Sequence, residues 1–110
     1  MKVNIQYKKR EYEILIDDED YDKIKDLKLT ITTQNRYHKY VIDSNTRKRL
    51  YKFIIPCEAN QIGIHKNNNH FDFRKENLFI TTKKELNNLI KQGVIQQRFD
   101  ELDRIYYKFD

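Results

Sequence analysis

Residues 63–88 constrain the fold more than any other part of the chain. His65 precedes a loop that is rich in asparagine and basic side chains, and the short apolar segment 79–81 follows that loop. Thr82 then begins a segment with the composition of a helix start. This order predicts a strand, a loop, a second strand and a helix in succession. We expect Asn77 to pin the loop to backbone groups.

This succession resembles the ββα-metal site of HNH nucleases. In the homing-endonuclease branch of that family the site reads roughly Asp-His-x-Asn-Gly, then Asn-Arg-x-x-Asn-Leu, then a Thr-rich strand end and Glu-Asn on the helix. Residues 64–68, 73–78 and 82–86 align with these three parts without a gap. The resemblance implies a site in which oxygen ligands hold a divalent cation on the scissile phosphate while His65 deprotonates a water.

Three positions of the chain depart from the family's pattern. Ile64 stands where the family has its Asp, Leu86 where it has the helix Asn, and Lys52 where it has a His before the site. Isoleucine and leucine offer no lone pairs to a cation, so two protein ligands are missing at once. We therefore expect that His65 is a vestigial catalytic residue and that the protein binds no metal and no other cofactor.

The alternative interpretation is an active nicking or homing endonuclease of the HNH type. Such an enzyme would use His65 as its general base and would need Mg²⁺. Asp72 and His70 lie in the loop, and they are the side chains that could replace the missing ligands.

The basic charge of the chain is concentrated around this stretch. The net charge is +5, and residues 36–91 carry twelve Lys or Arg against five Asp or Glu, whereas residues 1–35 and 92–110 are each net −1. Such a distribution is typical of a surface that faces phosphates. We therefore expect a nucleic acid or a nucleoprotein complex as the partner. The candidate contacts are Arg36, Lys39, Arg47, Lys48, Arg49, Lys52, Lys66, Arg74 and Lys75.

The first half of the chain predicts an antiparallel β-meander with one short helix. The expected strands are residues 3–7, 12–16, 29–32, 37–42 and 49–55. A helix is expected near residues 18–28, with Asp17 as its N-cap. Residues 14–21 and 50–55 also occupy the places of the sheet that precedes the site in homing endonucleases, a sheet similar to the AP2-type DNA-binding sheet.

The last part of the chain predicts an amphipathic helix. Apolar residues recur at helical spacing over residues 94–107, after Gly93, which fits the C-cap of the preceding helix. This terminal helix either packs on the sheet of its own chain or pairs two copies in a homodimer. We expect one α+β domain over residues 1–110. Its parts are the meander (1–56), the HNH-like ββα unit (57–92) and the C-terminal helix (93–110).

The composition indicates an intracellular protein. Cys57 is the single cysteine, so no disulfide can form within the chain, and no apolar run is long enough to span a membrane. The start of the sequence also lacks the apolar region of a signal peptide. We expect a non-cutting, HNH-like nucleic-acid-binding or nucleoprotein-binding protein in the cytoplasm of a bacterial host, with DNA binding as one form of this activity. The resemblance to mobile-element nucleases implies a phage or mobile-element product, and inhibition of a host defence system such as CRISPR is one role for it.

Overall fold

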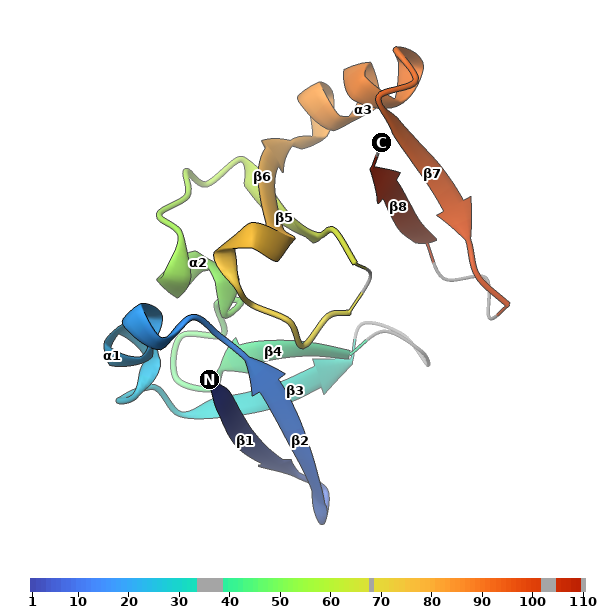
Figure 1. Ribbon diagram of the computed structural model, residues 1–110. Coiled ribbons are helices and arrows are strands. Elements are labelled where there is room, and N and C mark those ends of the chain that lie inside the picture. Colours follow the sequence, from blue (N-terminus) through green and yellow to red (C-terminus); the bar gives the residue numbers. More distant parts are fainter. Residues whose placement is uncertain (34–38, 68, 102–104, 110) are drawn as a thin grey trace.

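Short antiparallel strand pairs make up most of the architecture (Figure 1). The computed structural model describes residues 1–33, 39–67, 69–101 and 105–109. Within these residues, eight strands form four separate two-stranded antiparallel sheets, so the expected α+β class is confirmed. The strands are β1 (Lys2–Tyr7), β2 (Arg10–Leu15), β3 (Leu29–Thr33), β4 (Lys39–Asp43), β5 (Gln61–His65), β6 (Leu78–Thr82), β7 (Ile95–Phe99) and β8 (Ile105–Phe109). The helices are α1 (Tyr21–Ile24), α2 (Tyr51–Ile54) and α3 (Lys83–Lys91), with the 3₁₀ turns η1 (Asp18–Asp20) and η2 (Lys75–Asn77).

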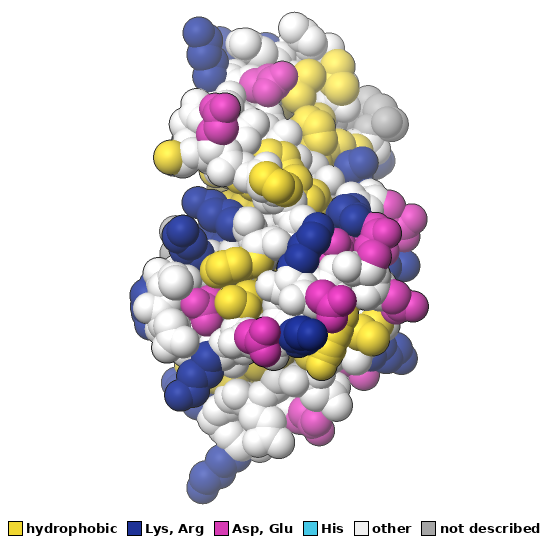
Figure 2. Space-filling view, turned by 90° about the vertical axis from the view of Figure 1, so that its left-hand side faces the viewer, with side chains coloured by type: hydrophobic (Ala, Val, Ile, Leu, Met, Phe, Trp, Pro, Cys, Tyr) yellow, Lys and Arg dark blue, Asp and Glu magenta, His cyan; other side chains and the backbone are white. Residues whose placement is uncertain are grey.

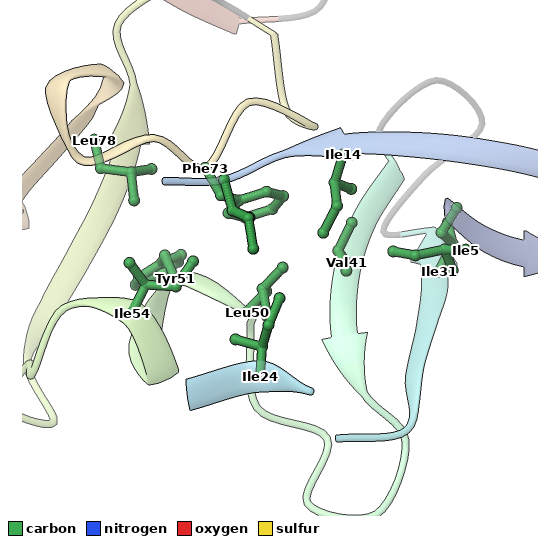
Figure 3. Close-up of a cluster of buried hydrophobic side chains, with 11 residues drawn as sticks. Ile5, Ile14, Ile24, Ile31, Val41, Leu50, Tyr51, Ile54, Phe73 and Leu78 are labelled. Atoms are coloured by element: carbon green, nitrogen blue, oxygen red, sulfur yellow. The ribbon is translucent and has the colours of Figure 1, made fainter. Parts of the chain in front are cut away.

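The main hydrophobic core gathers side chains from the first two hairpins, from α2 and from the loop between β5 and β6 (Figure 3). Ile14 comes from β2, Val41 from β4 and Leu50 from the start of α2. Phe73 belongs to the loop and is 2% exposed. The core therefore fixes the loop against the N-terminal half of the chain.

Backbone hydrogen bonds join the same loop to the end of β2. The N–H of Leu15 donates to the carbonyl oxygen of Phe71 (2.9 Å), and the N–H of Phe73 donates to the carbonyl oxygen of Leu15 (2.7 Å). Leu15 and Asp72 thereby form an isolated parallel bridge. This bridge places the loop beside the first hairpin, although the two are distant in the sequence.

The strand predicted over residues 49–55 is wrong, because most of this segment forms the helix α2. Arg49 alone keeps a bridge to β4. Leu50, Tyr51 and Ile54 are all buried. Their spacing is that of one helical face, whereas a strand would bury alternate residues. The predicted meander is therefore replaced by two separate hairpins.

The helix predicted near residues 18–28 is shorter than expected, because α1 ends at Ile24. Asp17 stands at the N-cap position of η1, but its side chain makes no capping hydrogen bond. Its Oδ2 instead accepts a hydrogen bond from the N–H of Lys75 (2.9 Å). Asp17 therefore links the start of the helical segment to the loop between β5 and β6.

The predicted succession of strand, loop, strand and helix is present in residues 61–91. β5 and β6 pair antiparallel over their whole length. Thr82 caps α3 as its Oγ1 accepts a hydrogen bond from the N–H of Glu85 (3.1 Å). Gly93 follows the helix in the left-handed conformation (φ 78°), and its N–H donates to the carbonyl oxygen of Ile90 (3.1 Å). Both ends of α3 thus agree with the local capping signals.

The helix predicted over residues 94–107 is wrong, since this part of the chain contributes to the β7–β8 hairpin. Ile95 is 1% exposed and lies opposite Phe109 in the strand pairing. Tyr107 and Phe109 both pack against the second hydrophobic cluster, which is formed by Ile64, Leu86 and Ile95. Alternate residues lie on the same face of a strand. Burial of this face against the second hydrophobic cluster selects the strand conformation here.

The sequence analysis expected no membrane-spanning segment and a single cysteine without a disulfide partner. No helix in the described part of the chain is long and apolar enough to cross a membrane. Cys57 is half-buried, and its thiol donates to the carbonyl oxygen of Ile55 (3.1 Å). Burial raises the pKa of the Cys57 thiol, so the residue has the properties of a small packing residue.

Candidate functional site

Asn77 holds the loop between β5 and β6 in place, as expected. It is buried, and its Oδ1 accepts a hydrogen bond from the N–H of Asn67 (2.9 Å). Its Nδ2 donates to the carbonyl oxygen of Asp72 (3.0 Å). The carbonyl oxygen of Asn77 accepts from the N–H of Lys66 (2.8 Å). One asparagine therefore ties the beginning, middle and end of the loop together.

Asp72 is buried at the centre of the loop. Its Oδ1 accepts hydrogen bonds from the N–H and Nε of Arg74 (3.2 and 2.9 Å), and its Oδ2 accepts from Arg74 Nη2 (2.7 Å) and Asn67 Nδ2 (2.8 Å). Hydrogen bonding to Arg74 is the main cause that lowers the pKa of Asp72 to about 2. A carboxylate offers about four acceptor sites, so those of Asp72 are used within the protein. The arrangement leaves no free lone pair for the metal of the alternative interpretation.

His65 ends β5 with one ring nitrogen fixed by the loop. Its Nδ1 lies 3.0 Å from the carbonyl oxygen of Asp72. Because a carbonyl oxygen only accepts hydrogen bonds, Nδ1 carries the proton and Nε2 keeps its lone pair. Burial is the main cause that lowers the pKa of His65, so the ring is neutral at neutral pH. His65 therefore has the orientation of a hydrogen-bond acceptor or a base.

A row of rings connects His65 with the second hairpin. His65 stacks on His70, with ring centroids 5.3 Å apart and planes at 24°. His70 meets Tyr40 edge-on at 5.8 Å, and the guanidinium of Arg49 lies 3.8 Å from the centroid of the Tyr40 ring. We call these four residues the aromatic row. The sequence singled out His65 and Arg49 separately, but it did not show the row, because its members come from four segments that meet only in the tertiary structure.

Ile64 and Leu86 occupy the two positions at which the sequence resemblance to HNH nucleases would place metal ligands. They are 7% and 5% exposed and belong to the second hydrophobic cluster with Ile95. Alternation along β5 turns Ile64 to the face opposite His65. Side chains of β6, α3 and β8 pack against this cluster. The two positions are therefore part of a small core and supply no ligand.

Two of the predicted nucleic-acid contacts are engaged in ion pairs. Arg74 Nη2 lies 2.7 Å from Asp72 Oδ2. The ammonium of Lys75 pairs with Glu19 and lies 3.3 Å from Asp20 Oδ1. Because carboxylates already compensate these charges, Arg74 and Lys75 are structural residues of the loop in this arrangement.

Of the six other predicted contacts that the structure describes, three are exposed and three are half-buried. Arg47, Lys48 and Lys66 are exposed, and none of them forms an ion pair with a described residue. Lys39 Nζ lies 3.4 Å from the hydroxyl of Tyr12. Arg49 belongs to the aromatic row, Lys52 is half-buried in α2, and Arg36 lies outside the described residues.

Asp17, Glu19 and Asp20 gather beside Lys75 at the start of α1. Their carboxylate oxygens lie within 4.8 Å of one another, and they are the one group of possible metal ligands found in the described residues. Asp20 Oδ1 lies 3.0 Å from Lys23 Nζ and 3.3 Å from Lys75 Nζ. Lysine ammonium groups thus compensate the acidic charge, and the cluster helps to hold the loop against the N-terminal half.

Comparisons of the chain with protein-family models, with curated proteins and with solved structures found no match. The likeness to HNH nucleases therefore rests on the three aligned segments of the sequence. The order of strand, loop, strand and helix in residues 61–91 agrees with that likeness.

Proposed function

We propose that the protein binds nucleic acid through an HNH-like strand, loop, strand and helix scaffold and does not cut it. The burial of Ile64 and Leu86 carries this proposal, because both ligand positions are built into an apolar cluster. A hard divalent cation needs oxygen ligands, and neither side chain supplies one. His65 by itself does not hold Mg²⁺.

The loop supports the same proposal. Asp72 would have to break its hydrogen bonds to Arg74 and Asn67 before it could coordinate a cation. Separating the guanidinium of Arg74 from Asp72 would leave a charge without its partner. His70 offers an imidazole nitrogen, which is not the preferred ligand of Mg²⁺. The described residues of the loop therefore offer no set of metal ligands for the nicking alternative.

The basic side chains support the binding part of the proposal. Arg47 and Lys48 are exposed in the turn after β4, and Lys66 is exposed at the start of the loop. The guanidinium carbon of Arg49 lies 3.8 Å from the centroid of the Tyr40 ring, and a guanidinium held against an aromatic ring in this way is suited to phosphate recognition. The partner is a nucleic acid, either naked or within a nucleoprotein complex such as a CRISPR effector of a phage host.

The test combines a cleavage assay with a binding assay. Supercoiled plasmid is incubated with the wild-type protein over a range of Mg²⁺ and Mn²⁺ concentrations, and duplex and single-stranded DNA are used in gel shifts. We expect shifted DNA in the presence of EDTA and no nicking at any metal concentration. Metal-dependent nicking that disappears in His65→Ala would overturn the proposal and establish the endonuclease instead. Absence of any shift would remove naked DNA as the partner.

A further inference from the structure

The turn of the first hairpin is strained by its own residues. β1 and β2 are joined by Lys8 and Lys9, since Tyr7 pairs directly with Arg10. Lys8 has φ 50° and Lys9 has φ 64°. Two-residue hairpin turns with positive φ at both positions favour Asn-Gly or Asp-Gly, because a Cβ is crowded in the left-handed region. Lysine at both positions is therefore unfavourable for the hairpin itself.

The same turn carries charge that the protein does not compensate. Lys8, Lys9 and Arg10 are exposed, and none of them forms an ion pair with a described residue. Lys8 Nζ lies 5.3 Å from the centroid of the Tyr7 ring. The turn projects from the rest of the molecule (Figure 1), and Lys or Arg side chains protrude at the same end in Figure 2. The tip thus presents three adjacent cations to solvent.

We propose that the β1–β2 hairpin is a second nucleic-acid contact, a basic ribbon whose tip enters the major groove of duplex DNA. Strands about 4.8 Å apart make a ribbon that fits a groove about 12 Å wide. Lys8, Lys9 and Arg10 then contact the phosphates that border the groove. This inference rests on the proposed nucleic-acid binding and extends it to a surface outside the HNH-like unit.

The charges farther along the hairpin limit the extent of this contact. Glu11 and Glu13 are exposed on β2, and Glu13 pairs with Lys2 on the neighbouring strand (3.7 Å). Carboxylates repel phosphates, so the hairpin contacts the DNA backbone with its last residues only. Asn4 and Gln6 are exposed on β1, where they lie directly opposite Glu13 and Glu11 in the strand pairing, so they belong to the acidic part of the hairpin that stays off the DNA.

Lys8 and Lys9 carry both the backbone strain and the positive charge. Substitutions at these two positions should therefore change both the stability of the protein and its binding to DNA. Replacing Lys8→Asn together with Lys9→Gly relieves the turn and removes both charges. The midpoint of thermal unfolding should rise by on the order of 5 °C. The salt dependence of binding to a short labelled DNA duplex should flatten by about 0.9 log unit for each phosphate that is no longer neutralised. One variant is therefore expected to be more stable and to bind more weakly.

Two further variants separate the causes. Lys8→Gln with Lys9→Gln removes the charges and keeps the strained turn, so it should weaken binding equally without raising the unfolding midpoint. Lys91→Gln with Lys108→Gln removes the same charge from exposed positions on α3 and β8, and its salt dependence should equal that of the wild type. An RNA duplex has a major groove too narrow for the ribbon, so the wild type and the Asn-Gly variant should bind it equally.

The outcomes distinguish this inference from the proposed function. If the wild type binds duplex DNA and the Asn-Gly variant binds it equally well, the hairpin is no contact and the proposed function stands. If the wild type binds no nucleic acid, both fail. If the affinity of the variant falls by the same factor for the RNA duplex as for the DNA duplex, the tip contacts phosphates without entering the groove. The proposed entry into the major groove would then be wrong. An unchanged unfolding midpoint would contradict the strain.

Discussion

Neighbouring residues of β5 face two different surroundings. His65 lies against the polar loop, in which Asp72 and Asn77 form a closed set of hydrogen bonds. Ile64, one residue before it, packs with Leu86 in the second hydrophobic cluster. The strand thus separates a polar network from a small apolar core.

The difference has a physical reason that does not depend on the metal. The loop satisfies buried polar groups by itself, and losing any of these hydrogen bonds costs free energy. A carboxylate or amide at position 64 or 86 would be buried, and without a metal ion it would lack a partner. Apolar side chains remove this cost and pack against the β7–β8 hairpin.

The largest expected effect tests the apolar side of β5. Ile64→Asp should lower the free energy of unfolding by about 3 kcal/mol, since it buries a carboxylate and removes apolar packing. Urea denaturation at neutral pH measures it. Val94→Asp is the control, because Val94 is 48% exposed beside the same cluster, and it should cost less than about 0.5 kcal/mol. Equal costs would show that the second cluster is not a core.

The same side can be tested with the family's residues restored. Ile64→Asp combined with Leu86→Asn should make the protein respond to Mn²⁺, with about 2.7 kcal/mol of added stability at a concentration a hundred times the dissociation constant. The stability of the wild type should not change with Mn²⁺. If Mn²⁺ stabilises the wild type as much as the double variant, the cation binds at another site.

A smaller effect is expected on the polar side. Asp72→Asn should cost about 2 kcal/mol, because Arg74 loses its charged partner. The pKa of Asp72 is lowered from 3.8 to about 2, so its contribution is present above about pH 4 and is lost as the pH falls toward 2. Denaturation curves of both proteins should therefore converge on acidification from pH 4. A constant difference down to pH 2 would contradict the network.

The basic residues of the second hairpin and α2 should affect binding more than stability. Replacing Arg47, Lys48, Arg49 and Lys52 by Ala should flatten the salt dependence of nucleic-acid binding by about 0.9 log unit for each phosphate that loses its cation. The exposed charges of Arg47 and Lys48 should contribute little to stability, and loss of the Arg49 contact with Tyr40 should cost about 1 kcal/mol. The control combines Lys25→Ala with Lys91→Ala, which removes positive charges elsewhere on the surface and should leave the salt dependence of binding unchanged. An unchanged slope in the fourfold variant would place the binding surface elsewhere.

The smallest effect is expected at His65. His65→Ala should weaken nucleic-acid binding by no more than about fivefold, because one neutral hydrogen bond contributes about 1 kcal/mol. Dissociation constants can be measured by fluorescence anisotropy in EDTA and in Mg²⁺. The ratio of the constants of the variant and the wild type should be the same in both. A ratio that depends on Mg²⁺ would give the histidine a role beside a metal.

Local signals predicted α3 well, and the reason is that both of its ends are determined by neighbouring residues. Thr82 caps its first turn and Gly93 ends it in the left-handed conformation. Asn77 was likewise identified from its position after the loop. By contrast, the aromatic row could not be predicted, because Tyr40 and Arg49 meet His65 only through the packing of distant segments.

The sequence by itself determined the first four strands of the N-terminal half, the strand, loop, strand and helix order, and the apolar identity of positions 64 and 86. Alternation, turns and caps act over a few residues, so they can be interpreted without the fold. The tertiary structure decided the conformation of α2, β7 and β8. A four-residue helix has little stability of its own, and the apolar residues after Gly93 fit either period. In both segments, burial against distant side chains selected the conformation.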